Sequence, residues 1–293
     1  MATERIKELP LVVIVGPTAS GKTNLAIELA KKYSGEIICA DSRTIYRGMD
    51  IGTAKPDIIE RAEVAHWGLD LVDPGERFTA ADFKVYANRK IVQIRDRNRI
   101  PFLVGGTGLY IEGVVFDFQF NGDINTTLRK KLEKMNLTEL HKYCSENNVI
   151  LPENSKNKRY IISAIERKGI SAKRKDTPIE NTIIVGITTR KDILRNRIEE
   201  RAEQFFANEV VNEAKQLGEK YGWKNEAMTG NIYPIMRQLL QGKLTETQAK
   251  EKFTTIDWRL AKRQLTWLKR NQYIQWYSLK EAREYLQSVL TML

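Results

Sequence analysis

A glycine-rich loop between an apolar segment and a helical pattern constrains the fold of this chain more than any other feature. Leu11–Val15 is apolar throughout and runs directly into Gly16-Pro17-Thr18-Ala19-Ser20-Gly21-Lys22-Thr23. This segment matches the P-loop typical of ATP-binding and other nucleotide-binding proteins, in the expected strand–loop–helix context. Backbone N–H groups of such a loop bind phosphate oxygens, the lysine adds a positive charge, and the threonine hydroxyl is placed to ligate Mg²⁺. The loop therefore predicts a di- or triphosphate site, with these binding residues: Gly16, Pro17, Thr18, Ala19, Ser20, Gly21, Lys22 and, also as metal ligand, Thr23.

Four short apolar segments predict a parallel sheet: Leu11–Val15, Glu36–Ala40, Pro101–Val104 and Thr182–Thr188. Between the first two, apolar residues from Leu25 to Tyr33 recur at helical spacing. Strands that alternate with helices are typical of α/β proteins. We therefore expect a P-loop NTPase-like α/β fold, in which helices flank a parallel sheet. After the fourth strand, the pattern predicts helices to the end of the chain.

The region 114–181 differs in composition from the rest of the chain. Apolar residues become sparse and basic residues accumulate, while short helical patterns cover Leu128–Met135 and Tyr160–Ile165. A mostly helical insertion domain is the preferred interpretation, and a solvated linker is the alternative. The expected organisation is a first part of the core at 1–113, the insertion at 114–181, and the continued core with basic C-terminal helices at 182–293.

The charge of the chain favours a polyanionic partner. Lys and Arg number 48 against 37 Asp and Glu, a formal net charge of +11, and neutralising phosphates releases counterions. A protein that is basic without such a partner is the alternative. The longest clean apolar run is far shorter than the roughly 20 residues that span a bilayer, and the N-terminus lacks the apolar segment of a secretory signal. We therefore expect a soluble, cytoplasmic protein with no membrane partner, and a monomer, because no feature suggests an obligate dimer.

Polar residues follow three of the predicted strands, at the sheet edge where ligands bind in open parallel sheets. Lys22, Asp41 and Thr107 are therefore expected on one rim. A carboxylate beside a phosphate loop can hold Mg²⁺ or accept a proton from a nucleophile; the alternative is that Asp41 and Ser42 cap a turn. The third strand ends in Gly105-Gly106-Thr107, not in a Walker-B aspartate, so ATP hydrolysis is not indicated.

Together these segments resemble the tRNA dimethylallyltransferase (tRNA isopentenyltransferase, IPP transferase) family. Gly16–Thr23, reading GPTASGKT, matches the family's phosphate loop at every position. Arg47–Pro56 (RGMDIGTAKP), a turn-rich segment expected to face substrate, matches the loop after the family's Asp-Ser motif. Pro101–Tyr110 (PFLVGGTGLY) matches the third signature, and Arg259–Arg270 (RLAKRQLTWLKR) resembles the C-terminal one. Four signatures in the family's order are much more specific than a phosphate loop alone.

The resemblance implies a prenyltransferase of tRNA modification. Its reaction transfers the dimethylallyl group from dimethylallyl diphosphate to N6 of the adenosine 3′-adjacent to the anticodon in tRNA, releasing diphosphate, with Mg²⁺ as cofactor. Asp41 would be the general base, while Lys22, Thr23 and Thr107 would act on the departing diphosphate. The implied catalytic residues are Asp41, Lys22, Thr23 and Thr107; the implied tRNA-binding residues are Asp41, Ser42, Arg43, Thr44, Lys55, Arg159, Lys262 and Arg263.

The C-terminal signature carries a second interpretation besides contact with RNA. Its basic residues alternate with tryptophans, and basic side chains reach phosphates while aromatic rings stack on bases. The alternative is an amphipathic helix whose leucines pack inward and whose charges face water. The resemblance favours RNA contact through Lys262 and Arg263, with Trp258 and Trp267 largely packed. The insertion domain would then clamp the anticodon stem.

Four positions depart from the family's pattern. Thr44 replaces the usual glutamine after Asp-Ser, and His66-Trp67 replaces paired histidines. In the insertion, Tyr160 and Ser163 stand where the family has two arginines, although Arg159 is adjacent to the first of these positions. Asn231–Pro234 keeps only the tyrosine of the family's Gly-Tyr-Lys segment. The diphosphate half of the site is therefore complete and part of the tRNA half is altered.

Three other functions remain open from the residues alone. Prenyl transfer to free adenine nucleotides would leave the basic C-terminal region unexplained, and a small-molecule P-loop kinase would leave RGMDIGTAKP unexplained. An RNA-binding protein without catalysis would not require Lys22, Thr23 and Asp41 together. Prenyl transfer to tRNA accounts for all of these features.

Overall fold

A six-stranded parallel sheet carries the phosphate loop at the carboxyl end of one of its inner strands. The computed structural model describes residues 9–120, 126–168 and 173–293. The sheet has the order β3-β2-β4-β1-β5-β6. Its strands are β1 (Leu11–Val15), β2 (Gly35–Ala40), β3 (His66–Trp67), β4 (Ile100–Gly105), β5 (Thr182–Thr188) and β6 (Gln275–Ser278). All of these pairings are parallel, as the alternating pattern predicts.

The register brings the three polar loops to one place. Val15 pairs with Gly105, and Ala40 pairs with Gly105 from the other side. The phosphate loop, the Asp-Ser segment and the Gly105-Gly106-Thr107 turn therefore leave neighbouring strands at the same level. The sequence-based expectation of a shared rim for Lys22, Asp41 and Thr107 agrees with this arrangement.

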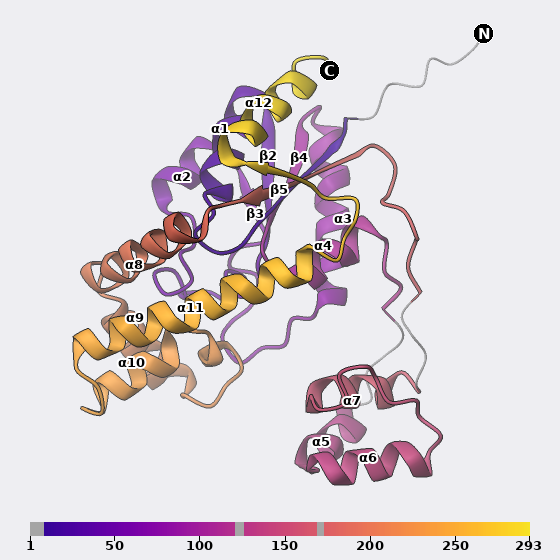
Figure 1. The fold of residues 1–293 in the computed structure, drawn as a ribbon, viewed down its shortest axis with the longest axis vertical. Helices are drawn as coiled ribbons and strands as arrows, with labels where there is room; N and C mark the ends of the chain where they lie inside the picture. Colours follow the sequence, from indigo (N-terminus) through magenta and orange to yellow (C-terminus); the bar gives the residue numbers. More distant parts are fainter. Residues whose placement is uncertain (1–8, 121–125, 169–172) are drawn as a thin grey trace. The chain divides into compact units, whose positions relative to one another are not determined.

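Helices cover both faces of the sheet (Figure 1). On one face, α1 (Lys22–Lys32) and α12 (Leu279–Leu290) pack on alternate strand residues, forming a core with Ile14, Phe102 and Val185. On the other face lie α3 (Ala80–Asp96) and α4 (Gly108–Val115), joined by a stacked ring pair of Phe83 and Tyr110. A short helix, α2 (Ile58–Glu63), follows the RGMDIGTAKP segment and has a capping box closed by Asp57.

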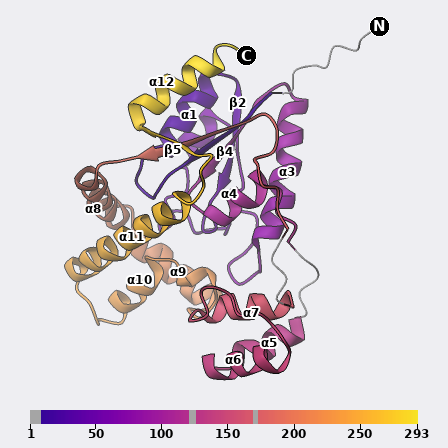
Figure 2. The same ribbon diagram turned by 45° about the vertical axis from the view of Figure 1, so that its right-hand side comes forward.

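A helical layer lies beside the carboxyl edge of the sheet. It contains α8 (Lys191–Ala207), α9 (Val210–Tyr221), the 3₁₀ turn η1 (Ala227–Thr229), α10 (Tyr233–Leu240) and α11 (Glu246–Leu268). Figure 2 shows α8 and α11 side by side, and their contact is a small core of Leu194, Ile198 and Ala261. Ala19 of the phosphate loop packs against the same core. The helical layer is thereby tied directly to the phosphate loop.

The chain forms two compact units: one is Met1–Val115 with Pro178–Leu293, and the other is Phe116–Thr177. The second unit contains α5 (Thr126–Lys134), α6 (Leu137–Glu146) and α7 (Lys158–Glu166), packed on Leu132, Leu140 and Ile161. Its bounds lie two to four residues inside the insertion expected at 114–181. The two helical patterns that the sequence placed there coincide with α5 and α7.

Two strands, β3 and β6, were not predicted from the sequence. β3 has two residues and β6 reads QWYS, and the residues of both are half-buried or exposed. Such short edge strands need no apolar run, so periodicity does not reveal them. The expectation that the chain is helical after β5 is therefore wrong at Gln275–Ser278. Among the described residues, no helix combines the length and the apolar character that a membrane span requires.

Candidate active site

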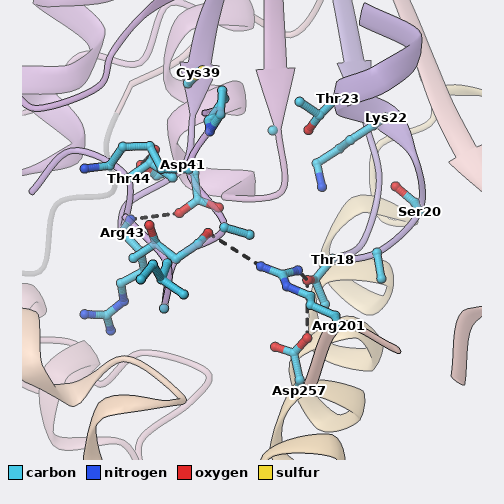
Figure 3. Close-up of a pocket in the computed structure, with 18 of the residues that line it drawn as sticks. Thr18, Ser20, Lys22, Thr23, Cys39, Asp41, Arg43, Thr44, Arg201 and Asp257 are labelled. Carbon is cyan, nitrogen blue, oxygen red and sulfur yellow. Dashed lines mark hydrogen bonds between the residues drawn. The ribbon is translucent and has the colours of Figure 1, made fainter. Parts of the chain in front are cut away.

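The rim of the first unit encloses a cavity of about 1150 Å³. Most of the residues singled out from the sequence line it: Thr18, Ala19, Ser20, Gly21, Lys22, Thr23, Asp41, Ser42, Arg43, Thr44, Lys55, Thr107 and Arg263. Gly16, Pro17 and Lys262 lie outside this lining, and Arg159 is an exposed residue of the second unit. Figure 3 shows the Lys22 ammonium and the Asp41 carboxylate directed toward the same space.

The phosphate loop presents an unusually polar and incompletely satisfied surface. Gly21 has a left-handed backbone, with φ of 87°, immediately before α1, a conformation that favours glycine and lets amides turn toward one centre. Lys22 Nζ donates to the Pro17 carbonyl at 3.1 Å. The buried Ser20 hydroxyl has no hydrogen-bond partner among the described residues. A buried polar atom without a partner costs free energy unless a ligand or water satisfies it, and Ser20 lines the cavity, where either can do so.

Burial lowers the pKa of Lys22 from 10.5 to about 8, with Arg201 acting in the same direction and Asp41 and Asp257 opposing it. The residue as a whole is only half-buried, but its ammonium group lies enclosed among the loop and these side chains. A cation held in a desolvated position gains strongly from an incoming anion. The geometry and charge of the loop therefore suit a diphosphate.

Asp41 and Thr107 meet where β2 and β4 end. The Thr107 hydroxyl accepts the Ser42 N–H at 3.1 Å, and Thr107 N–H donates to the Ala40 carbonyl at 3.2 Å. Asp41 Oδ1 accepts the Arg43 N–H at 2.8 Å, the turn-capping interaction that the sequence offered as an alternative role. This contact fixes the carboxylate, and Asp41 still lines the cavity. The capping role and a role as base are thus compatible.

A chain of polar contacts behind Thr18 was missed from the sequence. The Thr18 hydroxyl accepts a hydrogen bond from Arg201 Nη1 and donates to Asp257 Oδ2 at 3.3 Å. Gln264 Oε1 accepts the Thr18 N–H at 2.8 Å, and Asn231 Nδ2 donates to Asp257 at 3.1 Å. Figure 3 shows Arg201 beside Thr18 at the edge of the cavity. These contacts hold the phosphate loop from α8 and α11, and they bring a second cation to the site.

Arg201 and Arg197 are the functional candidates that sequence analysis did not find. Arg201 Nε is buried without a partner among the described residues, and Arg197 Nη1 donates to the Ser20 carbonyl at 3.2 Å. Both belong to a charge-rich helix in which Arg195 and several carboxylates face water. The one sequence feature that could have indicated these two arginines is their spacing of four residues, which places them on the same face of the helix.

Lys55 and Arg43, two of the residues assigned to tRNA binding, make contacts within the protein. The side chain of Lys55 is 0% exposed, and its ammonium contacts Asp50 and Asp70, both at 2.6 Å, and the Tyr46 carbonyl at 2.8 Å. The assignment of Lys55 to tRNA contact is therefore wrong, because a buried and fully engaged ammonium cannot reach a phosphate. Arg43 donates to the Glu226 carbonyl at 3.1 Å and so joins the rim to η1.

The C-terminal signature lies in the second half of α11 and combines both interpretations drawn from its sequence. Trp267 donates to Glu112 at 3.1 Å and packs on Gly108, so its ring is not a free stacking platform. Lys262 and Arg263 are exposed. Trp267 is therefore structural, while the two cations remain available to a ligand.

Comparison with known proteins shows the family of this chain. The family model described as IPP transferase matches residues 44–271, and that described as isopentenyl transferase matches residues 9–64. The chain belongs to the IPP transferase family. The "tRNA dimethylallyltransferase" of Desulforudis audaxviator is 38% identical over 291 residues, covering 93% of each chain. That of Staphylococcus haemolyticus is 36% identical, covering 92% of this chain and 86% of the relative.

Solved structures of IPP transferases share the fold. The tRNA isopentenylpyrophosphate transferase of Bacillus halodurans superimposes with a TM-score of 0.73 at 34% identity, over 98% of both chains. A eukaryotic dimethylallyltransferase acting on tRNA gives a TM-score of 0.76 at 22% identity, over 92% of this chain and 74% of that one. The expected P-loop-like α/β architecture with a parallel sheet is confirmed.

Proposed function

We propose that this chain is a tRNA dimethylallyltransferase, which transfers the dimethylallyl group from dimethylallyl diphosphate to N6 of the adenosine 3′-adjacent to the anticodon and releases diphosphate. One observation carries the proposal. A fixed carboxylate, Asp41, and a diphosphate-binding loop with Lys22 face a single cavity in a member of the IPP transferase family. A prenyl transfer needs these two groups on opposite sides of the reacting carbon.

The reaction requires the base and the leaving-group site to act together on two substrates, the adenosine and dimethylallyl diphosphate, held in one cavity. The lone pair of N6 attacks C1 of the dimethylallyl group, and the bond from C1 to the bridging oxygen breaks with its electrons moving to the diphosphate. Asp41 accepts the proton that N6 loses, a general-base role. The target adenine must leave the base stack to reach the cavity, where Ser42 and Thr44 lie next to Asp41.

The diphosphate would be held by the groups that lack partners or carry positive charge. The Ser20 hydroxyl and Arg201 Nε are both buried and unpaired in the described structure, and Lys22 lines the same cavity as these two residues. Donors that are already oriented toward developing negative charge stabilise the transition state more than they stabilise the substrate. Thr18 acts by positioning Arg201, and Thr107 by positioning Ser42.

The residues present also fit Mg²⁺. The described residues contain no cluster of three or more His, Cys, Asp or Glu side chains that could hold a metal, but Mg²⁺ at phosphate sites takes few protein ligands and fills the others with phosphate oxygens and water. Thr23 would supply a hydroxyl ligand beside Lys22. When bound, Mg²⁺ would neutralise charge on the diphosphate.

The affinity for dimethylallyl diphosphate is expected to fall above about pH 8. Lys22 is protonated below its pKa of about 8 in the free protein, and a bound diphosphate favours the ammonium and raises that pKa. Affinity should therefore be level below about pH 8 and fall by up to about tenfold per pH unit above it. Titration calorimetry from about pH 7 to about pH 10 measures this, with Lys22→Met as the control that should remove the slope. An equal slope in both proteins would contradict the assignment.

The exposed cations of α11 are expected to supply salt-dependent tRNA affinity. The double variant Lys262→Ala, Arg263→Ala should weaken tRNA binding and reduce the slope of log K against log salt by about 1 to 2. Each tRNA phosphate that the variant no longer contacts keeps its bound counterion, so fewer counterions are released on binding. Binding titrations at several salt concentrations measure the slope. Lys31→Ala with Lys280→Ala, on exposed faces of α1 and α12, is the matched control. A wild-type slope in the α11 variant would show that this face does not contact tRNA.

Competition between acceptors tests the proposed substrate. The specificity constant kcat/KM should be far higher for tRNA than for AMP with dimethylallyl diphosphate as donor, because only tRNA can use the basic face of α11. Incubation with ATP and no prenyl donor should release no phosphate above background. A higher specificity constant for AMP would indicate a nucleotide prenyltransferase, and phosphate transfer from ATP would indicate a kinase.

A further inference from the structure

The RGMDIGTAKP segment forms one wall of the cavity although it contains no helix or strand. Asp50, Gly52, Thr53 and Ala54 line the cavity along with their neighbours through Pro56. A polar loop of this length would be mobile unless its backbone groups were satisfied. Its hydrogen bonds show what holds it in place.

A single carboxylate on α9 binds three consecutive N–H groups of this segment. Glu213 Oε2 accepts the N–H groups of Asp50 at 2.8 Å and Ile51 at 2.6 Å, and Oε1 accepts that of Gly52 at 2.9 Å. Oε1 also accepts the Tyr233 hydroxyl at 2.9 Å. Four donors on two oxygens use the full acceptor capacity of an ionised carboxylate. A glutamine in its place would direct an NH₂ group at N–H donors.

The loop is shaped to fit this contact. A Cβ at Gly52 would lie 2.7 Å from Ile232 Cγ2 and 2.8 Å from the Tyr233 hydroxyl, so only glycine lets the loop approach α9 and α10 this closely. On its other side, the buried Lys55 binds the Asp50 carboxylate and the Tyr46 carbonyl. Lys55 also binds Asp70, which lies outside the loop. The loop is therefore held from both sides, and Glu213 is the residue that binds its Asp50–Gly52 amides.

The anchored loop reaches the phosphate side of the site through Arg201. Arg201 Nη2 lies 3.5 Å from the Thr53 carbonyl, while Nη1 of the same guanidinium contacts the Thr18 hydroxyl. Glu213 does not line the cavity itself, but the loop and Tyr233, which it holds, both do; it therefore acts on the reaction through these neighbours. We propose that Glu213 is a positioning residue for prenyl transfer, which holds the Asp50–Thr53 wall and thereby Arg201 in register with the phosphate loop. This inference rests on the proposed function.

Hydrogen exchange and kinetics of Glu213→Gln test the proposal together. Amide exchange at Asp50, Ile51 and Gly52 should accelerate on the order of ten- to a hundredfold, as expected when hydrogen bonds to a charged acceptor are lost. The kcat for tRNA should fall about tenfold or more, while the Kd for dimethylallyl diphosphate stays within about threefold, because Lys22 and the phosphate loop are unchanged and Arg201 acts chiefly on the charge that develops in the transition state. Glu219→Gln, an exposed change on the same helix, should alter none of the three.

Protection of the three amides at the wild-type level, or a wild-type kcat, would overturn the proposal. If Glu213→Gln unfolds, Gly52→Ala tests the same contact from the loop side and should reproduce the local exchange and the fall in kcat. A wild-type protein that does not modify tRNA would instead refute the proposed function. An active wild type with an equally active Glu213→Gln variant would refute this inference alone.

Discussion

Replacing Asp41 with asparagine is expected to lower kcat for dimethylallyl transfer by roughly 10²–10⁴-fold, the range that a positioned general base contributes. Asparagine can still accept the Arg43 N–H that fixes the wild-type carboxylate at 2.8 Å, so the turn should persist. It cannot accept the N6 proton. The affinity for tRNA should therefore stay close to that of the wild type.

Single-turnover kinetics with saturating tRNA isolate the chemical step, and a binding titration measures tRNA affinity separately. Asp96→Asn, an exposed change in the last turn of α3, serves as the control and should behave as wild type. A large loss of tRNA affinity in Asp41→Asn, with the rate at saturation preserved, would make Asp41 a binding residue and not the base.

Lys22→Met is expected to lower kcat/KM for dimethylallyl diphosphate by about 10²–10³-fold, the cost of removing one oriented donor from a developing anion. Burial already lowers the pKa of this ammonium to about 8, which shows that it lies in a poorly solvated position where its interaction with the diphosphate is strong. Lys31→Met changes an exposed lysine of the same helix and should have no such effect. An unchanged kcat/KM in Lys22→Met would mean that the diphosphate lies elsewhere.

The part of the site that depends on local sequence was predictable. The phosphate loop, Asp41 and Thr107 each follow an apolar strand directly, and a parallel sheet brings such positions to one edge whatever the rest of the chain does. The four longer strands and the insertion were visible for the same reason, because their patterns lie within single short segments. The reaction was inferred from the family signatures, because neither residue spacing nor composition indicates it.

The contacts that complete the site were not predictable, because they join residues far apart in the chain. Thr18 is separated from Arg201 by 183 residues and from Asp257 by 239, and the loop amides lie more than 160 residues from Glu213. Nothing local distinguishes these charges from their exposed neighbours on the same helices. For Lys55 the local sequence was misleading. Its polar segment suggested an exposed lysine that could contact tRNA, but ion pairs with Asp50 and Asp70 allow the ammonium to be buried.

The central claim is most directly tested by the mass of the product. Purified protein is incubated with Mg²⁺, dimethylallyl diphosphate and an unmodified tRNA that has consecutive adenosines from the last anticodon base onward, and the digested RNA is analysed by mass spectrometry. The same tRNA with guanosine replacing the adenosine 3′-adjacent to the anticodon is the control. Gain of one dimethylallyl group on that adenosine, with none on the control, is the predicted result. No gain on the adenosine, with tRNA still bound, would contradict the proposed reaction.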